Sequence, residues 1–265
     1  MKIFQVDSFT NKPFTGNPAG VCILSGNLPD FDMLKIANEM NLPETAFLQE
    51  KDGGYDLRWF TPQAEVELCG HATLACAHVL WEIGALDQDE IASFDTLSGR
   101  LTAKKNGAWI DLDFPAQYET NIDAPVELIR ALGVKLEYVG KNRFDYLVEV
   151  ESEKKVRDMK PDFDLLKKVP CRGVIVTSKA DDGGYDFVSR FFAPAIGVDE
   201  DPVTGSAHCC LGPYWKSRLK KSEFEAFQLS ERGGVVRVKV VPGSDRVTLS
   251  GRAVTVIKGE LVYGC

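Results

Sequence analysis

The chain repeats one sequence plan. Gly53–Pro62 (GGYDLRWFTP) returns as Gly183–Pro194 (GGYDFVSRFFAP), with two extra residues in the second copy. Each copy leads through an acidic loop and a glycine into a short helix-like run that ends in tryptophan, at Trp81 and at Trp215. Copies about half the chain apart are spaced too widely for a solenoid, whose period is about 20–50 residues. The repeat therefore predicts two similar lobes with a cleft between them.

One helix in each half is unusually apolar. Ala72–Trp81 contains no charged residue, and a helix that is apolar all round is buried all round. Its second copy contains Gly212 and Pro213, so we expect it to be shorter or kinked. Strands dominate the rest of both halves. The predicted class is α+β, with each lobe a curved, mostly antiparallel sheet or barrel around a central buried helix.

A stretch with proline and aspartate, Phe114–Pro125, marks the boundary between the lobes. At 265 residues the chain has room for two units of domain size. We place the N-terminal lobe at 1–118 and the C-terminal lobe at 119–265. The last C-terminal residues are candidates to complete the first lobe.

Composition excludes several classes of function. A net charge of −8 argues against a nucleic-acid partner, and the longest uncharged run, Cys69–Trp81, is too short to span a bilayer. The N-terminal residues lack the apolar core of a signal peptide. The seven cysteines form no paired framework and no Cys-x-x-Cys, a pattern of reduced thiols. We expect a cytoplasmic protein without a metal centre.

Small residues lead into both apolar helices, at Cys69–His71 and Thr204–Ser206. The first N–H groups of a helix have no partner within the helix and carry a partial positive charge, so such a start can hold an anion. If the lobes face one another, both starts could hold one substrate carboxylate. The alternative is that Gly70 and Gly205 only permit tight turns.

Three titratable residues lie beside these helix starts. Asp201 precedes the second helix, His71 begins the first, and Glu44 follows Pro43 at the start of a strand. By repeat position the counterpart of Glu44 is Cys171 or Arg172, so the carboxylate occurs in one half only. His71 is the natural partner for proton transfer. A lone glutamate at a strand start is ordinarily solvated or capping, and a lone histidine at a helix start ordinarily caps it.

Together these motifs resemble the PhzF (phenazine biosynthesis-like) family. The matching segments occur in order along nearly the whole chain: Phe14–Ala19, Asn41–Phe47, Arg58–Pro62, Leu68–Thr73 and Asp201–His208. The resemblance implies a diaminopimelate-epimerase-like fold and a homodimer. It also implies a cofactor-independent isomerase that moves a proton on a small carboxylate, as family members do on a cyclic dihydro-hydroxyanthranilate.

The resemblance assigns roles residue by residue. Glu44 would be the general acid/base, and His71 and Asp201 would bind and polarise the substrate. The substrate would be held by Asn17, Gly70, Gly205 and Ser206. The family chemistry needs no metal or nucleotide, and the sequence has no Walker, Gly-x-Gly-x-x-Gly or His-Glu-x-x-His motif.

Two alternatives remain. Amino-acid racemases and epimerases of this fold use two opposed cysteines, and Cys69 is suitably placed, but Thr204 occupies the second position. A non-catalytic small-molecule-binding protein could keep the same fold. The joint presence of Glu44, His71, Asp201 and Ser206 argues against it, because a scaffold needs no base.

Overall fold

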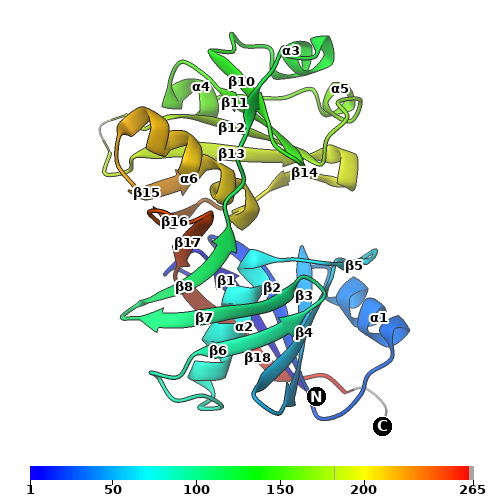
Figure 1. The fold of residues 1–265 in the computed structure, drawn as a ribbon. Coiled ribbons are helices and arrows are strands. Elements are labelled where there is room, and N and C mark those ends of the chain that lie inside the picture. Colours follow the sequence, from blue (N-terminus) through cyan, green and yellow to red (C-terminus); the bar gives the residue numbers. More distant parts are fainter. Residues whose placement is uncertain (182, 263–265) are drawn as a thin grey trace. The chain divides into compact units, whose positions relative to one another are not determined.

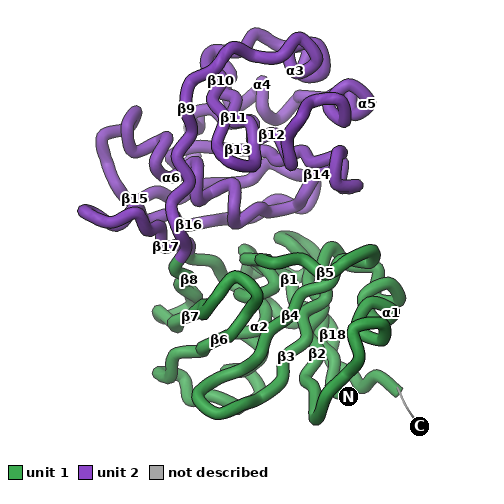
Figure 2. The backbone as a smooth tube through the Cα atoms, turned by 45° about the vertical axis from the view of Figure 1, so that its right-hand side comes forward, with its two compact units in different colours: residues 1–113, 250–265 green, residues 114–249 purple. Residues whose placement is uncertain are grey.

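The computed structural model describes residues 1–181 and 183–262, and the chain divides into two compact units (Figures 1 and 2). Unit 1 comprises Met1–Asp113 with Ser250–Cys265, and unit 2 comprises Phe114–Leu249. The expected boundary at 118/119 thus differs from the observed one at 113/114. The C-terminal segment belongs to unit 1, because its strand pairs with the first strand of the chain. Cys265 lies outside the described residues.

Unit 1 is a sheet with two helices. The helices are α1 (Asp30–Met40) and α2 (Gly70–Glu82). Its strands are β1 (Lys2–Ser8), β2 (Asn17–Leu24), β3 (Glu44–Lys51), β4 (Gly54–Phe60), β5 (Glu65–Val66), β6 (Ala92–Thr96), β7 (Gly99–Asn106), most of β8 (Trp109–Pro115) and β18 (Ala253–Glu260). The pairs β2–β3 and β4–β6 are parallel, and β18–β1, β1–β2, β3–β4, β4–β5, β6–β7 and β7–β8 are antiparallel.

Unit 2 repeats this topology. Its strands are β9 (Thr120–Asn121), β10 (Tyr138–Lys141), β11 (Asp145–Glu149), β12 (Gly173–Lys179), β13 (Phe187–Ala193), β14 (Val198–Asp201), β15 (Glu223–Gln228), β16 (Gly234–Val240) and most of β17 (Arg246–Gly251). Its helices are α3 (Val126–Leu132), α4 (Glu153–Arg157), α5 (Phe163–Leu166), the 3₁₀ turn Pro194–Ile196 and α6 (Gly205–Leu219). The pairs β11–β12 and β13–β15 are parallel, as β2–β3 and β4–β6 are in unit 1. In this correspondence β9 takes the place of β18. Strand β9 pairs antiparallel with β10, as β18 does with β1.

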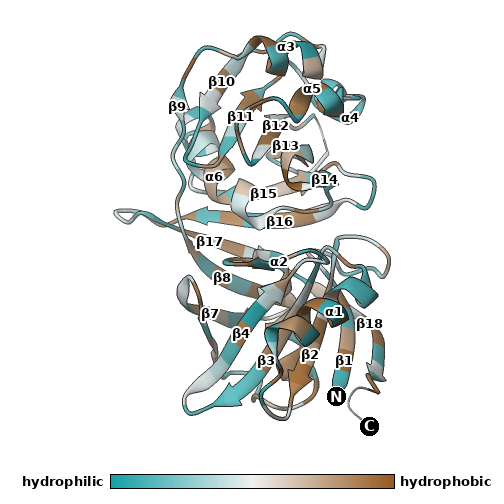
Figure 3. Cartoon of the chain, turned by 90° about the vertical axis from the view of Figure 1, so that its right-hand side faces the viewer, coloured by the Kyte–Doolittle hydropathy of each residue, from teal (hydrophilic) through white to brown (hydrophobic). Residues whose placement is uncertain are grey.

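Helix α2 lies within unit 1 and contacts β1, β2, β3, β7 and β18 (Figure 1). All its residues from His71 to Trp81 are buried except His78. The prediction of a central, fully buried helix is therefore confirmed. Helix α1 instead buries one face, through Met33, Ile36 and Ala37, and turns hydrophilic residues outward (Figure 3). Among the described residues, the structure contains no helix with the length and apolarity needed to cross a membrane.

Helix α6 corrects one expectation. It runs for 15 residues against 13 in α2, although Pro213 lies inside it, so it is not the shorter copy. A proline cannot donate the hydrogen bond to the carbonyl four residues earlier, which here is that of Cys209. The backbone N–H of Gln117 donates to this carbonyl instead, over 3.0 Å. An outside donor thus replaces the one that Pro213 lacks.

The repeated motif carries a repeated ion pair. Arg58 binds Glu65 through two hydrogen bonds of 2.7 Å, and Arg190 binds Glu200 through two of 2.7 Å. Each arginine also lies over the ring of the phenylalanine two residues later, Phe60 or Phe192. The sequence repeat is thus a repeat in three dimensions.

Because α2 is the core of unit 1, shortening one of its buried side chains should lower the free energy of unfolding. Leu74 is fully buried, and Leu74→Ala should lower the free energy of unfolding by about 3 kcal/mol through lost burial and a residual cavity. Leu97, 68% exposed, is the control, and Leu97→Ala should change it by less than about 0.5 kcal/mol. Urea unfolding monitored by circular dichroism measures both; equal losses would show that α2 is not the core.

Candidate active site

A histidine and a glutamate meet in unit 1. Glu44 is the first residue of β3, immediately after the segment where Asn41 closes α1 in a left-handed conformation. His71 is the second residue of α2. Its Nε2 lies 3.2 Å from Oε2 of Glu44, and the two side chains are 7% and 20% exposed. The pairing that the sequence suggested is thus present in the structure.

Neighbouring groups fix this pair. Asn17, the first residue of β2, places its Nδ2 3.3 Å from Nδ1 of His71, and Sγ of Cys69 lies 3.5 Å from the same Nδ1. Ser8 Oγ donates to the His71 carbonyl over 2.8 Å, and Thr73 Oγ1 donates to the Cys69 carbonyl over 2.6 Å. The start of α2 is therefore anchored through both backbone and side chain.

Burial and charge set the protonation of the group. Burial, with Glu44 adding to it, raises the pKa of the Cys69 thiol, so the thiol is neutral near pH 7. Burial works to lower the pKa of His71, but Cys69 and Glu44 together raise it well above its usual value. Apart from its contact with His71, Oε2 of Glu44 is buried without a hydrogen-bond partner among the described residues.

The second helix start is built from different groups. Asp201 ends β14, and its carboxylate accepts a hydrogen bond from the hydroxyl of Thr204, the residue before α6. Gln228 holds both ends of this loop: its Nε2 donates to the Asp201 carbonyl over 2.7 Å, and its Oε1 accepts from the Thr204 N–H over 2.9 Å. The loop before α6 is therefore rigidly tied to β15.

Ser206 contacts a residue that the sequence analysis did not assign to the site. Arg172 Nη2 donates to Ser206 Oγ over 3.0 Å, and its Nε donates to Oδ1 of Asp145 over 2.9 Å. Asp145 is 1% exposed, and such a buried carboxylate needs a cationic partner. The signal available in the sequence was the position of Arg172 directly before a strand that corresponds to β3.

Strand register corrects the counterpart of Glu44. Thr45 pairs with Phe60 in unit 1, and Val174 pairs with Phe192 in unit 2. Glu44 precedes Thr45, and Gly173 precedes Val174. The counterpart of Glu44 in unit 2 is therefore Gly173, and the expectation of Cys171 or Arg172 was wrong. A Cβ on Gly173 would lie 2.3 Å from the Phe191 ring, which leaves no space for a side chain. The absence of a carboxylate at this position in unit 2 is confirmed.

The predicted residues thus form two local groups. Glu44, His71, Asn17 and Gly70 lie together in unit 1, with Cys69. Asp201, Gly205 and Ser206 lie at the start of α6 in unit 2.

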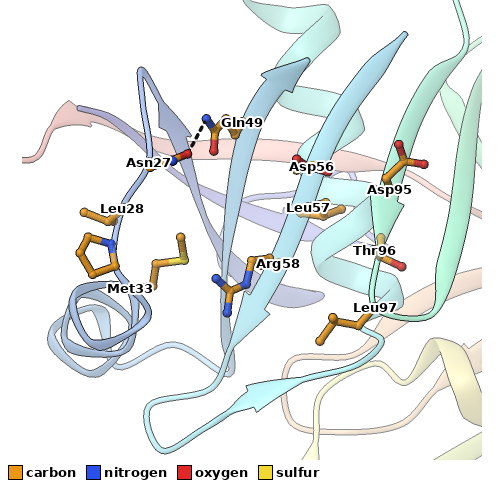
Figure 4. Close-up of a pocket in the computed structure, with 11 residues that line it drawn as sticks. Asn27, Leu28, Met33, Gln49, Asp56, Leu57, Arg58, Asp95, Thr96 and Leu97 are labelled. Carbon is orange, nitrogen blue, oxygen red and sulfur yellow. Dashed lines mark hydrogen bonds between the residues drawn. The ribbon is translucent and has the colours of Figure 1, made fainter. Parts of the chain in front are cut away.

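A separate groove of about 600 Å³ lies in unit 1 and is lined by none of the predicted site residues (Figure 4). Its charged groups are already paired, because Arg58 binds Glu65 and Asp30, and Asp95 binds Lys51 and Arg100. Glu44, in contrast, has a buried carboxylate oxygen, Oε2, without a hydrogen-bond partner among the described residues apart from its contact with His71. We therefore take the Glu44 group as the candidate active site.

His208 supports the start of α6. It is completely buried, and Nδ1 donates to the Thr204 carbonyl over 2.8 Å. Thr73 makes the equivalent bond to Cys69 in α2. Burial lowers the pKa of His208 to about 4, so the folded protein holds it neutral. Its contacts are structural, because the buried ring holds the carbonyl at the helix start.

The lowered pKa of His208 predicts that the folded protein loses stability in acid. The pKa of His208 is about 4 in the folded protein and near 6.5 in the unfolded chain. The neutral ring therefore contributes its full stabilisation of the folded state above about pH 6.5, and this contribution is lost as pH falls toward 4. Between pH 7 and 5 it should account for about 2 kcal/mol of lost unfolding free energy. His208→Gln should remove that part of the pH dependence in urea titrations at the two values. An unchanged slope would show that His208 titrates normally.

Comparisons with known proteins find relatives along nearly the whole chain. The model of the phenazine biosynthesis-like protein family (PhzC-PhzF) matches residues 6–259. An uncharacterized isomerase of Halalkalibacterium halodurans is 54% identical over 261 residues, which cover 98% of each chain. The solved structure of a PhzF-family protein of Enterococcus faecalis has a TM-score of 0.93 at 41% identity and covers 98% of each chain. A hydroxyproline epimerase of Agrobacterium vitis, 12% identical with a TM-score of 0.64 over 98% of this chain and 91% of its own, shares the fold.

Proposed function

The chain belongs to the phenazine biosynthesis-like (PhzC-PhzF) family and is an isomerase, and we propose that Glu44 moves a proton on a small, cyclic carboxylate substrate. The observation that supports this most directly is the buried Glu44–His71 pair, with a 3.2 Å contact between carboxylate and imidazole. A base near a C–H bond in a dry pocket can remove the proton and return it elsewhere. Glu44 would do both.

His71 complements this role. With its pKa raised by the neighbouring charge, it would be an imidazolium that donates to a substrate oxygen as negative charge develops there. Asn17 lies beside the opposite nitrogen, and its amide oxygen would accept from that N–H when the amide is turned over. The pair would therefore combine a base with an adjacent electrophile, and the reaction would need no cofactor.

Unit 2 is proposed to contribute binding groups. By the family resemblance, Asp201 would polarise the substrate, and Gly205 and Ser206 would hold it by backbone N–H and hydroxyl groups. The first turn of α6 contains no acidic residue, which suits the N-terminal end of a helix dipole to an anion. Homodimer formation is proposed on the same resemblance.

The racemase alternative calls for a test because Cys69 occupies the N-cap position of α2, beside His71. Two-base inversion needs a second thiol on the facing side of the substrate, and Thr204 caps α6 in unit 2. In addition, burial raises the pKa of Cys69, the opposite of what an activated thiolate requires. Both observations favour Glu44 as the base.

Glu44→Gln should abolish proton transfer while preserving the fold. We expect the rate of solvent-deuterium uptake into a turned-over cyclic carboxylate to fall by about 10²–10⁴-fold, the usual contribution of a general base. Glu50, exposed at the other end of β3, provides the matched control Glu50→Gln. NMR in heavy water measures the exchange, and full exchange by the Glu44 variant would refute the proposal.

Cys69→Ser separates the two chemistries. A thiol base would lose at least about 10³-fold in exchange rate, whereas a proton transfer through Glu44 should lose less than about tenfold, because only the packing beside His71 changes. The same NMR assay, with melting temperature as a check on folding, reads out the result. A large loss with an unchanged melting temperature would favour the racemase.

A further inference from the structure

We propose that unit 1 binds one zinc ion through Glu44, Cys69 and His71, and that zinc thereby inhibits the enzyme. One donor atom from each of these three side chains lies within 4.8 Å of the other two. They are the one such group of histidine, cysteine and acidic residues among residues 1–181 and 183–262. Zinc binding itself does not depend on which residue is the catalytic base, whereas the inhibition rests on the proposed function of Glu44.

The separations suit tetrahedral coordination. Zn–S of about 2.3 Å and Zn–N or Zn–O of about 2.0–2.1 Å imply edges of about 3.6 Å between S and N and about 3.4 Å between N and O. In the structure, Nε2 of His71 lies 3.2 Å from Oε2 of Glu44 and 4.0 Å from Sγ of Cys69. A shift of about 0.4 Å by the thiol would bring its sulfur to that distance from Nε2, and all three side chains offer donor atoms within 4.8 Å of one another.

The surroundings supply what a metal site needs. A metal-binding histidine usually donates its other ring N–H to a nearby oxygen, which fixes the ring. The side-chain amide of Asn17 lies beside Nδ1 of His71, and its oxygen can accept that proton when the amide is turned over. The backbone carbonyls of His71 and Cys69 are each held by a hydroxyl, from Ser8 and Thr73. Two of the three ligands are thus held at a fixed helix start.

The donor set selects the metal. A thiolate, an imidazole and a single carboxylate favour zinc, whereas magnesium and calcium need mostly oxygen ligands. Three protein ligands would leave a fourth position for water or another small ligand. With zinc bound, the Glu44 carboxylate would hold the metal and could not take a proton from the substrate.

The repeat provides an internal control. Gly173, Thr204 and Ser206 stand in unit 2 where Glu44, Cys69 and His71 stand in unit 1. None of these three offers a carboxylate, a thiolate or an imidazole. The expected stoichiometry is therefore one zinc per chain.

Isothermal titration of the full chain with zinc sulfate tests the inference. We expect one zinc per chain with a dissociation constant of about 1 μM or lower, and no comparable binding of magnesium chloride. Cys69→Ser should weaken binding at least tenfold, and so should His71→Gln. Cys76→Ala, which removes a buried thiol of the same helix, should bind like the wild type. Circular dichroism confirms that each variant is folded.

Two results would overturn the inference: a stoichiometry other than one, or equal zinc affinity in the Cys69→Ser variant and the wild type. Zinc should also stop the deuterium exchange, and excess EDTA should restore it. The two proposals fail separately. If Glu44→Gln still exchanges protons while zinc binds through Cys69, the proposed function falls and the zinc site stands. If Glu44→Gln is inactive and zinc does not bind, only the zinc site falls.

Discussion

The burial of a charge-free helix is the constraint on which unit 1 depends. Helix α2 contributes a nearly continuous row of buried side chains, including Leu74, Leu80 and Trp81, so the strands can only surround it. Its first turn cannot rely on a side-chain cap, since Cys69 makes no capping hydrogen bond. The partial positive charge of that turn, to which His71 belongs, lies beside Glu44. The element that stabilises the fold therefore also places the reactive groups.

The two units show how one plan accommodates different chemistry. The backbone pairing and the arginine–glutamate pairs are alike in both. The differences occur at the helix starts, where His71 faces Glu44 in one copy and Ser206 faces Arg172 in the other. A carboxylate–imidazole pair lies at one helix start, and an arginine–serine hydrogen bond lies at the other.

The sequence predicted what depends on local pattern or repetition. The apolar run in α2, the repeat around Arg58 and Arg190, and the neighbouring positions of Glu44 and His71 were all accessible in this way. The contact of Arg172 with Asp145 and Ser206 was not, because it joins segments far apart in sequence without a motif. That Pro213 does not shorten α6 could not be predicted for a similar reason. The donor that compensates for Pro213 comes from Gln117, outside the helix, and helix propensity alone contains no such information.

The place of β18 has a consequence for how the chain is made. The last strand completes the sheet of the unit that is synthesised first: it pairs along the whole of β1, and Leu261 donates to the carbonyl of Met1. Residues 114–249 contain everything assigned to unit 2, so that unit can close while β1 still presents an unpaired edge on the ribosome. Unpaired strand edges invite wrong partners. The half that leaves the ribosome first is thus the half that must wait longest for its final strand.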